Sequence, residues 1–259
     1  MRYLISLLLL TMTLLFVPGC SDNSPTSSSD GMGVLKVLFT DSPGDFDEVN
    51  ITIEEVSVHK DSSWVILNEN EQTHNLIELA NGITAVLGEE QLDPGIYDQI
   101  RLKIKAAELK IDDDIFPLDV PSGAQSGLKL HGNFTIEEGI LTELVIDFDV
   151  AKSIHEIAKK QEYKLNPSLR VIAKSTSGAI IGHVTNPENE PVVFAIAGSD
   201  TVTSSIVDPQ DGNFMLSFLP SGTYTVAFED TLNYKCEVSN TVVSIGNKEN
   251  LGDITLALE

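Results

Sequence analysis

Acidic residues offer the clearest opportunity for chemistry in this sequence. Asp147 and Asp149 alternate along one expected strand and so project from the same face, while Asp41 opens an acidic loop. The remaining acids of that loop are Asp45, Asp47 and Glu48. Carboxylates on a loop and at a strand end are the ligands that calcium prefers. The sequence therefore predicts a candidate calcium site at Asp41, Asp147 and Asp149.

The same acids also have a plainer interpretation. No Asp-x-Asp-x-Asp-Gly calcium loop is present. Basic residues alternate along another expected strand, at Arg101, Lys103 and Lys105, and could pair across strands with Asp147 and Asp149. That pairing would give an ordinary charged face of a sheet. Both interpretations stay open, because the sequence does not show which groups meet in space.

The usual signatures of catalysis are missing from the sequence. His155-Glu156 begins like a zinc-protease helix, but Lys159 stands where the second His must be. No Gly-x-Ser-x-Gly elbow and no phosphate-binding loop occur. Since no nucleophile, base and orienting group can be named together, we predict no catalytic residue and no enzymatic activity. Apart from calcium, we expect no cofactor.

Aromatic side chains are a further set of candidate binding groups. Sugars can stack on exposed rings, and Trp64 is the single Trp of the chain. Aromatic residues make up only 6% of the sequence, so most of them should lie in cores. We therefore name Trp64 alone as a candidate glycan contact. A glycan- or calcium-dependent adhesin is the alternative to a purely structural role.

The N-terminus carries a modification signal. Arg2 precedes a largely apolar run from Leu4 to Val17, and Gly19 precedes Cys20. This pattern resembles a bacterial lipoprotein signal peptide, although Val17 and Pro18 depart from its commonest form. The resemblance implies cleavage before Cys20 and attachment of diacylglycerol to its thiol. Ordinary secretion is the alternative, because Val-Pro-Gly also fits a general cleavage site.

The signal divides the N-terminal region in two. We expect residues 1–19 to be the signal peptide, and residues 20–33 to be the lipidated Cys and a flexible tether with a reach of about 20 Å. The protein would then be exported and held in the cell envelope by its lipid, with Ser21 favouring the outer membrane or cell surface.

Composition and net charge limit the classes of partner that the protein is expected to bind. The chain has 259 residues and a formal charge of −23, which disfavours nucleic acid and anionic lipid. An envelope protein, a glycan or a cation remains possible. Only two cysteines occur, so Cys236 has no partner once Cys20 is lipidated, and no disulfide framework is expected. Cys236 lies among strand-forming residues and is expected to be a small buried side chain.

Residues 34–174 show mostly period-two patterning, which predicts a β-rich domain. Leu35, Val37 and Phe39 alternate in this way, and a strand from 49 to 59 changes phase at Glu54-Glu55, which predicts a bulge. Two segments differ. Residues 76–87 are expected to form short helical turns, and the spacing of apolar residues over 150–160 predicts one short helix.

Five sequence blocks in this region resemble a bacterial envelope family, the domain of unknown function 4382. They are Phe39-Thr40-Asp41-Ser42-Pro43, Gly95-Ile96-Tyr97-Asp98-Gln99-Ile100-Arg101-Leu102, Ser126-Gly127-Leu128-Lys129-Leu130, Asp147-Phe148-Asp149-Val150-Ala151-Lys152-Ser153 and Leu165-Asn166-Pro167. The resemblance implies a β-rich, often lipid-anchored domain with no established activity.

Residues 178–259 form a second expected domain. The stretch Gly212-Asn213-Phe214 through Leu219-Pro220-Ser221-Gly222-Thr223-Tyr224-Thr225-Val226 resembles a carboxypeptidase regulatory-like, transthyretin-like β-sandwich. Such modules are typically structural or interaction domains. Gly95 and Tyr97 have the same spacing as Gly222 and Tyr224, which predicts a tyrosine at the corner of each domain. The predicted fold is thus mainly β, with two sandwich-like domains in tandem.

Overall fold

The computed structural model describes residues 31–42, 46–112, 114–157 and 162–258, so the predicted signal peptide and Cys20 lie outside the described residues. Most of the described residues lie in β-strands, which confirms the predicted mainly β fold. Their helical elements are the helices α1 (Ser122–Gly127) and α2 (Val150–Ser153) and the 3-10 turns η1 (Leu76–Leu79) and η2 (Lys174–Thr176). No helix in this part of the chain is long and apolar enough to cross a membrane.

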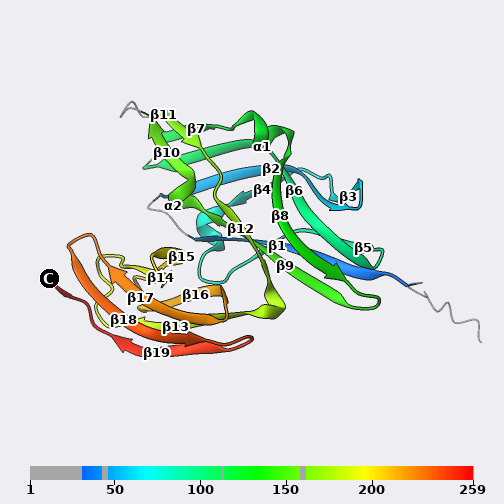
Figure 1. Cartoon of the computed structure of the whole chain (residues 1–259). Helices are drawn as coiled ribbons and strands as arrows, with labels where there is room; N and C mark the ends of the chain where they lie inside the picture. Colours follow the sequence, from blue (N-terminus) through cyan, green and yellow to red (C-terminus); the bar gives the residue numbers. More distant parts are fainter. Residues whose placement is uncertain (1–30, 43–45, 113, 158–161, 259) are drawn as a thin grey trace, which may run out of the picture. The chain divides into compact units, whose positions relative to one another are not determined.

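Two sheets build the first module. One sheet has the order β12 (Leu169–Ala173), β9 (Leu141–Asp149), β1 (Gly33–Ser42) and β5 (Ala85–Leu92). The other has the order β10 (Ile154–Ile157), β11 (Glu162–Leu165), β7 (Asp114–Asp119), β6 (Gly95–Ile111), β2 (Glu48–Lys60) and β3 (Ser63–Asn68). In addition, β4 (Gln72–Asn75) pairs with β2, and β8 (Leu128–Ile136) pairs with β6. The central pair β1 and β9 runs parallel (Figure 1).

The first core lies between these two sheets. Leu35, Val37 and Phe39 of β1 are buried, as their alternation predicts, and they pack with Ile100 and Leu102 of β6. Each fully buried side chain of this size contributes about 2 kcal/mol to folding. The inward residues of β1 therefore fix which way its polar neighbours, including those near Asp41, can point.

A bulge in β2 confirms the predicted change of phase. The register of β2 against β6 shifts between Ile53 and Glu55. Glu55 then accepts hydrogen bonds from Arg101 over 2.8 Å and from Lys103 over 2.5 Å. Burial opposes ionisation of Glu55, but these two cations lower its pKa below the ordinary value. Arg101 and Lys103 of β6 are therefore engaged by an acid on the neighbouring strand β2.

The helix expected over residues 150–160 is wrong in length. Within the described part of this range, which ends at residue 157, only Val150–Ser153 is helical, and Ile154–Ile157 then forms β10 paired with β11. The Ser153 hydroxyl accepts the backbone N–H of Ser168 over 2.9 Å, which holds the chain against the segment that follows β11. Tertiary pairing thus overrides the helical spacing, and α1 is a second short helix that the sequence pattern did not predict.

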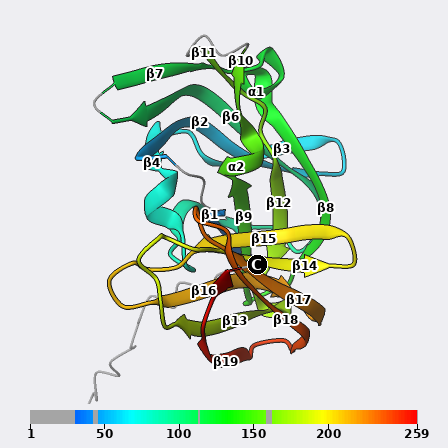
Figure 2. The ribbon, with the colours of Figure 1, turned by 90° about the vertical axis from the view of Figure 1, so that its left-hand side faces the viewer.

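The second module is a sandwich of a three-stranded and a five-stranded sheet (Figure 2). The three-stranded sheet has the order β16 (Asn213–Pro220), β13 (Ser177–Val184) and β19 (Lys248–Ile254). The five-stranded sheet has the order β15 (Asp200–Ile206), β14 (Val192–Ala197), β17 (Gly222–Glu229), β18 (Tyr234–Val243) and β20 (Ala257–Leu258). Its core is separate from the first and includes Ile180, Leu216, Val226 and Phe228. Cys236 is half-buried at the margin of this core.

Both predicted tyrosine corners are present. The hydroxyl of Tyr97 donates to the carbonyl oxygen of Asp93 over 3.0 Å, and that of Tyr224 donates to the carbonyl oxygen of Pro220 over 2.8 Å. In each case the bond spans four residues across a turn and ties the ring to the start of its strand. The shared spacing in the sequence therefore reflects one local device used twice.

We predict that Tyr224→Phe lowers the free energy of unfolding of the second module by about 1 kcal/mol, because it removes one hydrogen bond and keeps the ring. Tyr97→Phe is the matched change in the first module and should have a similar effect there. Urea unfolding of each variant measures this. If neither change shifts the midpoint, the hydroxyls do not stabilise the corners.

Candidate functional site

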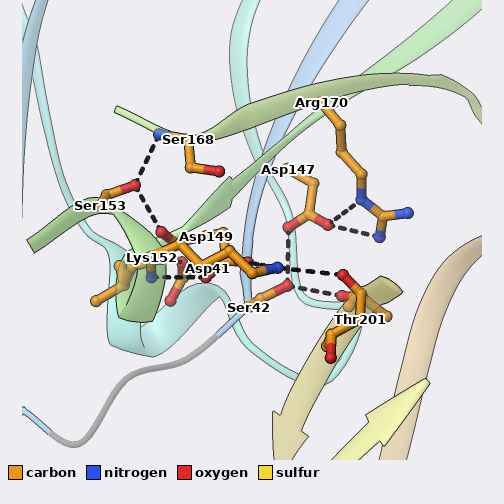
Figure 3. Close-up of polar contacts among 11 residues, drawn as sticks. Asp41, Ser42, Asp147, Asp149, Lys152, Ser153, Ser168, Arg170 and Thr201 are labelled. Atoms are coloured by element: carbon orange, nitrogen blue, oxygen red, sulfur yellow. Dashed lines mark hydrogen bonds and ion pairs between the residues drawn. The ribbon is translucent and has the colours of Figure 1, made fainter. Parts of the chain in front are cut away.

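The predicted acidic residue Asp147 is buried in an ion pair. Its partner is Arg170, which stands directly opposite it on the neighbouring strand β12. Arg170 Nε donates to Asp147 Oδ2 over 2.6 Å, and Arg170 Nη2 lies 2.6 Å from the same oxygen (Figure 3). Burial raises the pKa of Asp147, and the guanidinium offsets part of that rise. The predicted cationic partners Arg101, Lys103 and Lys105 were therefore wrong.

Asp149 has a local structural role at the start of α2. Its carboxylate accepts the backbone N–H of Lys152 over 3.0 Å, which caps the first turn of the helix. The ammonium of Lys152 lies 2.8 Å from the other carboxylate oxygen. Lys152 is thus the cation that Asp149 binds, instead of a residue of β6.

Asp41 is the least compensated acid in this region. It lies in strand β1, not in a loop as predicted, and it is only 6% exposed. Its Oδ1 accepts the backbone N–H of Val150 over 3.2 Å, while its Oδ2 is buried without a hydrogen-bond partner among the described residues. Burial first, and then the nearby charge of Asp147, raise the pKa of Asp41 well above its usual range.

The other acids of the predicted loop do not all join Asp41. Asp45 lies outside the described residues. Asp47 accepts the backbone N–H of Asp112 over 2.6 Å, at the turn between β6 and β7. Glu48 lies in β2 and accepts a hydrogen bond from Lys110 over 2.7 Å. The expected acidic loop therefore divides between two different places in the module.

The geometry decides how calcium could bind. Among the described residues, no group of three or more Asp, Glu, His or Cys side chains is placed to hold a metal ion. Asp41 and Asp147 are close enough to influence each other electrostatically, but Asp147 and Asp149 already have cationic partners. Calcium would have to displace Arg170 and Lys152, so its binding here stays a prediction without geometric support.

One polar strand of the second module meets this region. Strand β15 carries Thr201, Thr203 and Ser205 at alternate positions, so their side chains share one face. Thr203 Oγ1 lies 2.6 Å from Ser42 Oγ, and Ser42 in turn donates to Asp147 Oδ1 over 3.3 Å. Both hydroxyl-bearing residues are buried. A hydrogen-bonded chain therefore runs from the Arg170 ion pair into the second module.

Thr201 and Ser205, which lie on either side of Thr203 in β15, are contacted by two other elements of the first module. Lys152 of α2 donates through its ammonium to the carbonyl oxygen of Thr201 over 3.1 Å (Figure 3). The Ser205 hydroxyl donates to the side-chain oxygen of Asn81. Thr201, Thr203 and Ser205 are thus each bound by a different element of the first module.

Asn81 owes its position to a tight turn. Asn81 and Gly82 both have positive φ, 55° and 81°, and the Ile83 N–H donates to the carbonyl oxygen of Ala80 over 3.1 Å. Asn-Gly is the sequence that this kind of turn favours. The Asn81 side chain also accepts the Met215 N–H over 3.2 Å and donates to the Ile206 carbonyl oxygen over 3.3 Å. It therefore joins β15 to β16.

We call this set of contacts the polar joint. Its members are Ser42, Asn81, Asp147, Lys152, Arg170, Thr201, Thr203 and Ser205. Arg170 also reaches the second corner: burial raises the pKa of Tyr224, and the Arg170 guanidinium counteracts that rise. The joint links the two modules through hydrogen bonds and ion pairs, although Arg170 Nη2 has only its ion-pair contact with Asp147 and no hydrogen bond among the described residues.

Sequence reasoning found Asp41, Asp147 and Asp149 but missed their partners. Arg170, Asn81 and the polar face of β15 were not singled out. Two signals for them are present, namely the Asn81-Gly82 turn pair and the alternation of hydroxyl residues in Thr201-Val202-Thr203-Ser204-Ser205. Neither signal says what the side chains contact.

Trp64, the candidate glycan contact, is already surrounded. The Arg101 guanidinium carbon lies 4.2 Å from the ring centroid and Lys129 Nζ lies 5.7 Å from it. The ring centroid of His59 is 5.0 Å away. A sugar that stacked on this indole would compete with these groups, so glycan binding at Trp64 stays a prediction.

Comparison with known proteins gives one family match. The family described as "Domain of unknown function (DUF4382)" matches residues 32–167. No curated protein matches the sequence. The matched segment contains β1, β9 and α2, and therefore Asp41, Asp147 and Asp149, whereas Arg170 and β15 lie beyond it.

Similarities to solved structures are distant. The Bacillus anthracis TIE protein has 13% identity and a TM-score of 0.22, with 87% of this chain and 34% of that chain covered. A fimbrial protein from Bacteroides ovatus has 13% identity and a TM-score of 0.22, with coverages of 88% and 51%. The shaft pilin SpaA from Lactobacillus rhamnosus GG has 10% identity and a TM-score of 0.23, with coverages of 88% and 99%. The chain thus spans about a third and a half of the first two, and scores this low carry no functional argument.

Proposed function

The chain belongs to the DUF4382 family, and from this premise we propose that it is a non-enzymatic, lipid-anchored protein of the cell envelope. Its two β modules would act as one structural or protein-interaction unit, exported to the outer membrane or cell surface. We further propose that residues 178–259 are a carboxypeptidase regulatory-like module. The polar joint is the single observation that carries the structural part of this proposal.

The joint supports a structural role because of where its polar groups point. Asp147 and Arg170 bind each other, and Ser42 and Thr203 continue the same chain of contacts inside the protein. Each of these side chains is thus engaged by another side chain of the protein itself. Buried groups that satisfy one another in this way fix geometry.

The anchor part of the proposal rests on the N-terminal sequence. Residues 4–17 are largely apolar and end just before Gly19-Cys20, and the polar stretch that follows offers a short tether. Two or more acyl chains hold a protein stably on a membrane, whereas one chain is marginal. The lipid on Cys20 would therefore be sufficient as the attachment of both modules.

We predict that Cys20→Ser moves the protein from the membrane fraction to the soluble fraction, because serine cannot take the thioether-linked lipid. Cell fractionation followed by a salt wash measures this. Cys236→Ser removes the other thiol and should leave the protein with the membrane. If Cys20→Ser still sediments with washed membranes, the anchor is wrong and the folded modules bind the envelope themselves.

A further inference from the structure

A trough runs along the three-stranded sheet of the second module. Two hollows of about 380 Å³ and 280 Å³ share Met215 and Lys248 in their linings, so they adjoin. We use the word trough for the surface lined by Ile181, His183, Met215, Ser217, Lys248 and Asn250. None of these side chains is a member of the polar joint, although the backbone N–H of Met215 donates to Asn81, and none was predicted as a site from the sequence.

Strand pairing explains the lining of the trough. Ile181 on the central strand β13 stands opposite Met215 on β16 and Asn250 on β19. Paired residues lie on the same face of a sheet, so the half-buried Ile181 and Met215 form an apolar floor beside an amide. Two positions further along β13, His183 stands opposite Asp253, and its Nδ1 lies 3.0 Å from Asp253 Oδ1.

The other end of the trough meets the first module. Gly82, from the Asn81-Gly82 turn, and Lys174 both line the second hollow. A Cβ at Gly82 would lie 2.6 Å from Ser217 Oγ, so only glycine leaves that end open. Ser217 Oγ is itself buried and has no hydrogen-bond partner among the described residues. Because this oxygen has almost no accessible surface, it is not open to a ligand in the trough.

The charges of the trough differ from those of the whole chain. The chain carries a formal charge of −23. In the trough, Lys174 pairs with Glu143 over 3.0 Å and His183 pairs with Asp253. Lys248 adds a further cation. The lining is thus close to neutral, which suits an uncharged ligand better than a polycation or a polyanion.

We propose that this trough binds a neutral oligosaccharide. Ile181 and Met215 would contact the apolar C–H face of a sugar, while Asn250 and His183 would form hydrogen bonds with its hydroxyls. The six residues of β16 from 213 to 218 extend over about 20 Å, long enough for several linked sugars. This site lies on the other module from Trp64 and does not depend on the lipid anchor.

Binding of purified full-length protein to a panel of neutral and charged oligosaccharides tests the proposal. We expect the protein to bind at least one neutral oligosaccharide. His183→Ala and Ile181→Ser should each weaken that binding at least tenfold. His131→Ala, an exposed histidine on β8, and Trp64→Ala should leave it unchanged. Lys248→Ala changes an exposed residue that lines the trough, so its effect on binding does not arise from altered packing of the core.

Two results would overturn this assignment. One is the absence of binding to every neutral oligosaccharide, including the case in which only charged glycans bind. The other is binding that His183→Ala, Ile181→Ser and Lys248→Ala leave at the wild-type level, or that Trp64→Ala alone abolishes. Fractionation of Cys20→Ser is a separate readout, so failure of the trough and failure of the anchor are distinguishable.

Discussion

Arg170→Ala is expected to lower the free energy of unfolding by about 3 kcal/mol, since it leaves a buried carboxylate without its cation. Asp147 is 4% exposed, so its carboxylate has little contact with water to compensate for the loss of the guanidinium. The Arg170 side chain is 25% exposed, which places the effect at the lower end of the range for buried pairs. The loss should also weaken the link through Ser42 to Thr203.

Urea unfolding followed by Trp64 fluorescence measures the effect of Arg170→Ala. Lys174→Ala is the matched control, because Lys174 also pairs with an acid of β9, Glu143, but on the surface. Surface pairs of this kind contribute about 0–1 kcal/mol. Equal, small effects of both changes would show that the Arg170 pair does not stabilise the fold.

At neutral and alkaline pH, Asp41→Asn is expected to raise the free energy of unfolding, whereas Arg170→Ala lowers it. The pKa of Asp41 is raised above its ordinary value of 3.8, so the folded protein holds the proton more tightly than the unfolded chain. The stability contributed by neutral Asp41 is complete below that ordinary value and is lost as pH rises through the folded pKa. Repulsion from Asp147 and Asp149 adds to this loss.

Asparagine keeps the shape and the acceptor for the Val150 N–H but never ionises. Asp41→Asn should therefore match the wild type near pH 4 and exceed its free energy of unfolding by about 1–2 kcal/mol at pH 8, the usual cost of an uncompensated buried polar group. Unfolding midpoints from pH 4 to 8 measure the difference. Asp147→Asn is the control and should destabilise, because it leaves Arg170 without its partner. If Asp41→Asn instead lowers the free energy of unfolding at pH 8, the inference that the ionised Asp41 carboxylate destabilises the folded protein is contradicted.

Local patterns explain what could be predicted of the fold. Alternation placed Leu35, Val37 and Phe39 in the core because a strand has a period of two. The break at Glu54-Glu55 predicted a bulge, and the spacing of Gly and Tyr predicted both corners. Each of these features is decided by residues close together in the chain.

The features that could not be predicted depend on distant pairings. Asp147 binds Arg170 because β12 adds to the edge of β9 in one register, and a shift of one residue would turn Arg170 to the other face. Thr203 meets Ser42 across 161 positions. The helical spacing after Val150 was overridden by the pairing of β10 with β11. Tertiary partners decide such sites, and a single sequence does not name them.

The central claim is that the polar joint couples the two modules into one unit. Trp64 is the single Trp and reports on the first module, while in Cys20→Ser protein Cys236 is the single thiol and reports on the second. Unfolding in urea can thus be followed by Trp64 fluorescence and by the labelling of Cys236 in one sample. Coincident midpoints, which separate in Asn81→Ala or Arg170→Ala protein, are the predicted result. Separate midpoints in the protein with an intact joint would contradict the claim.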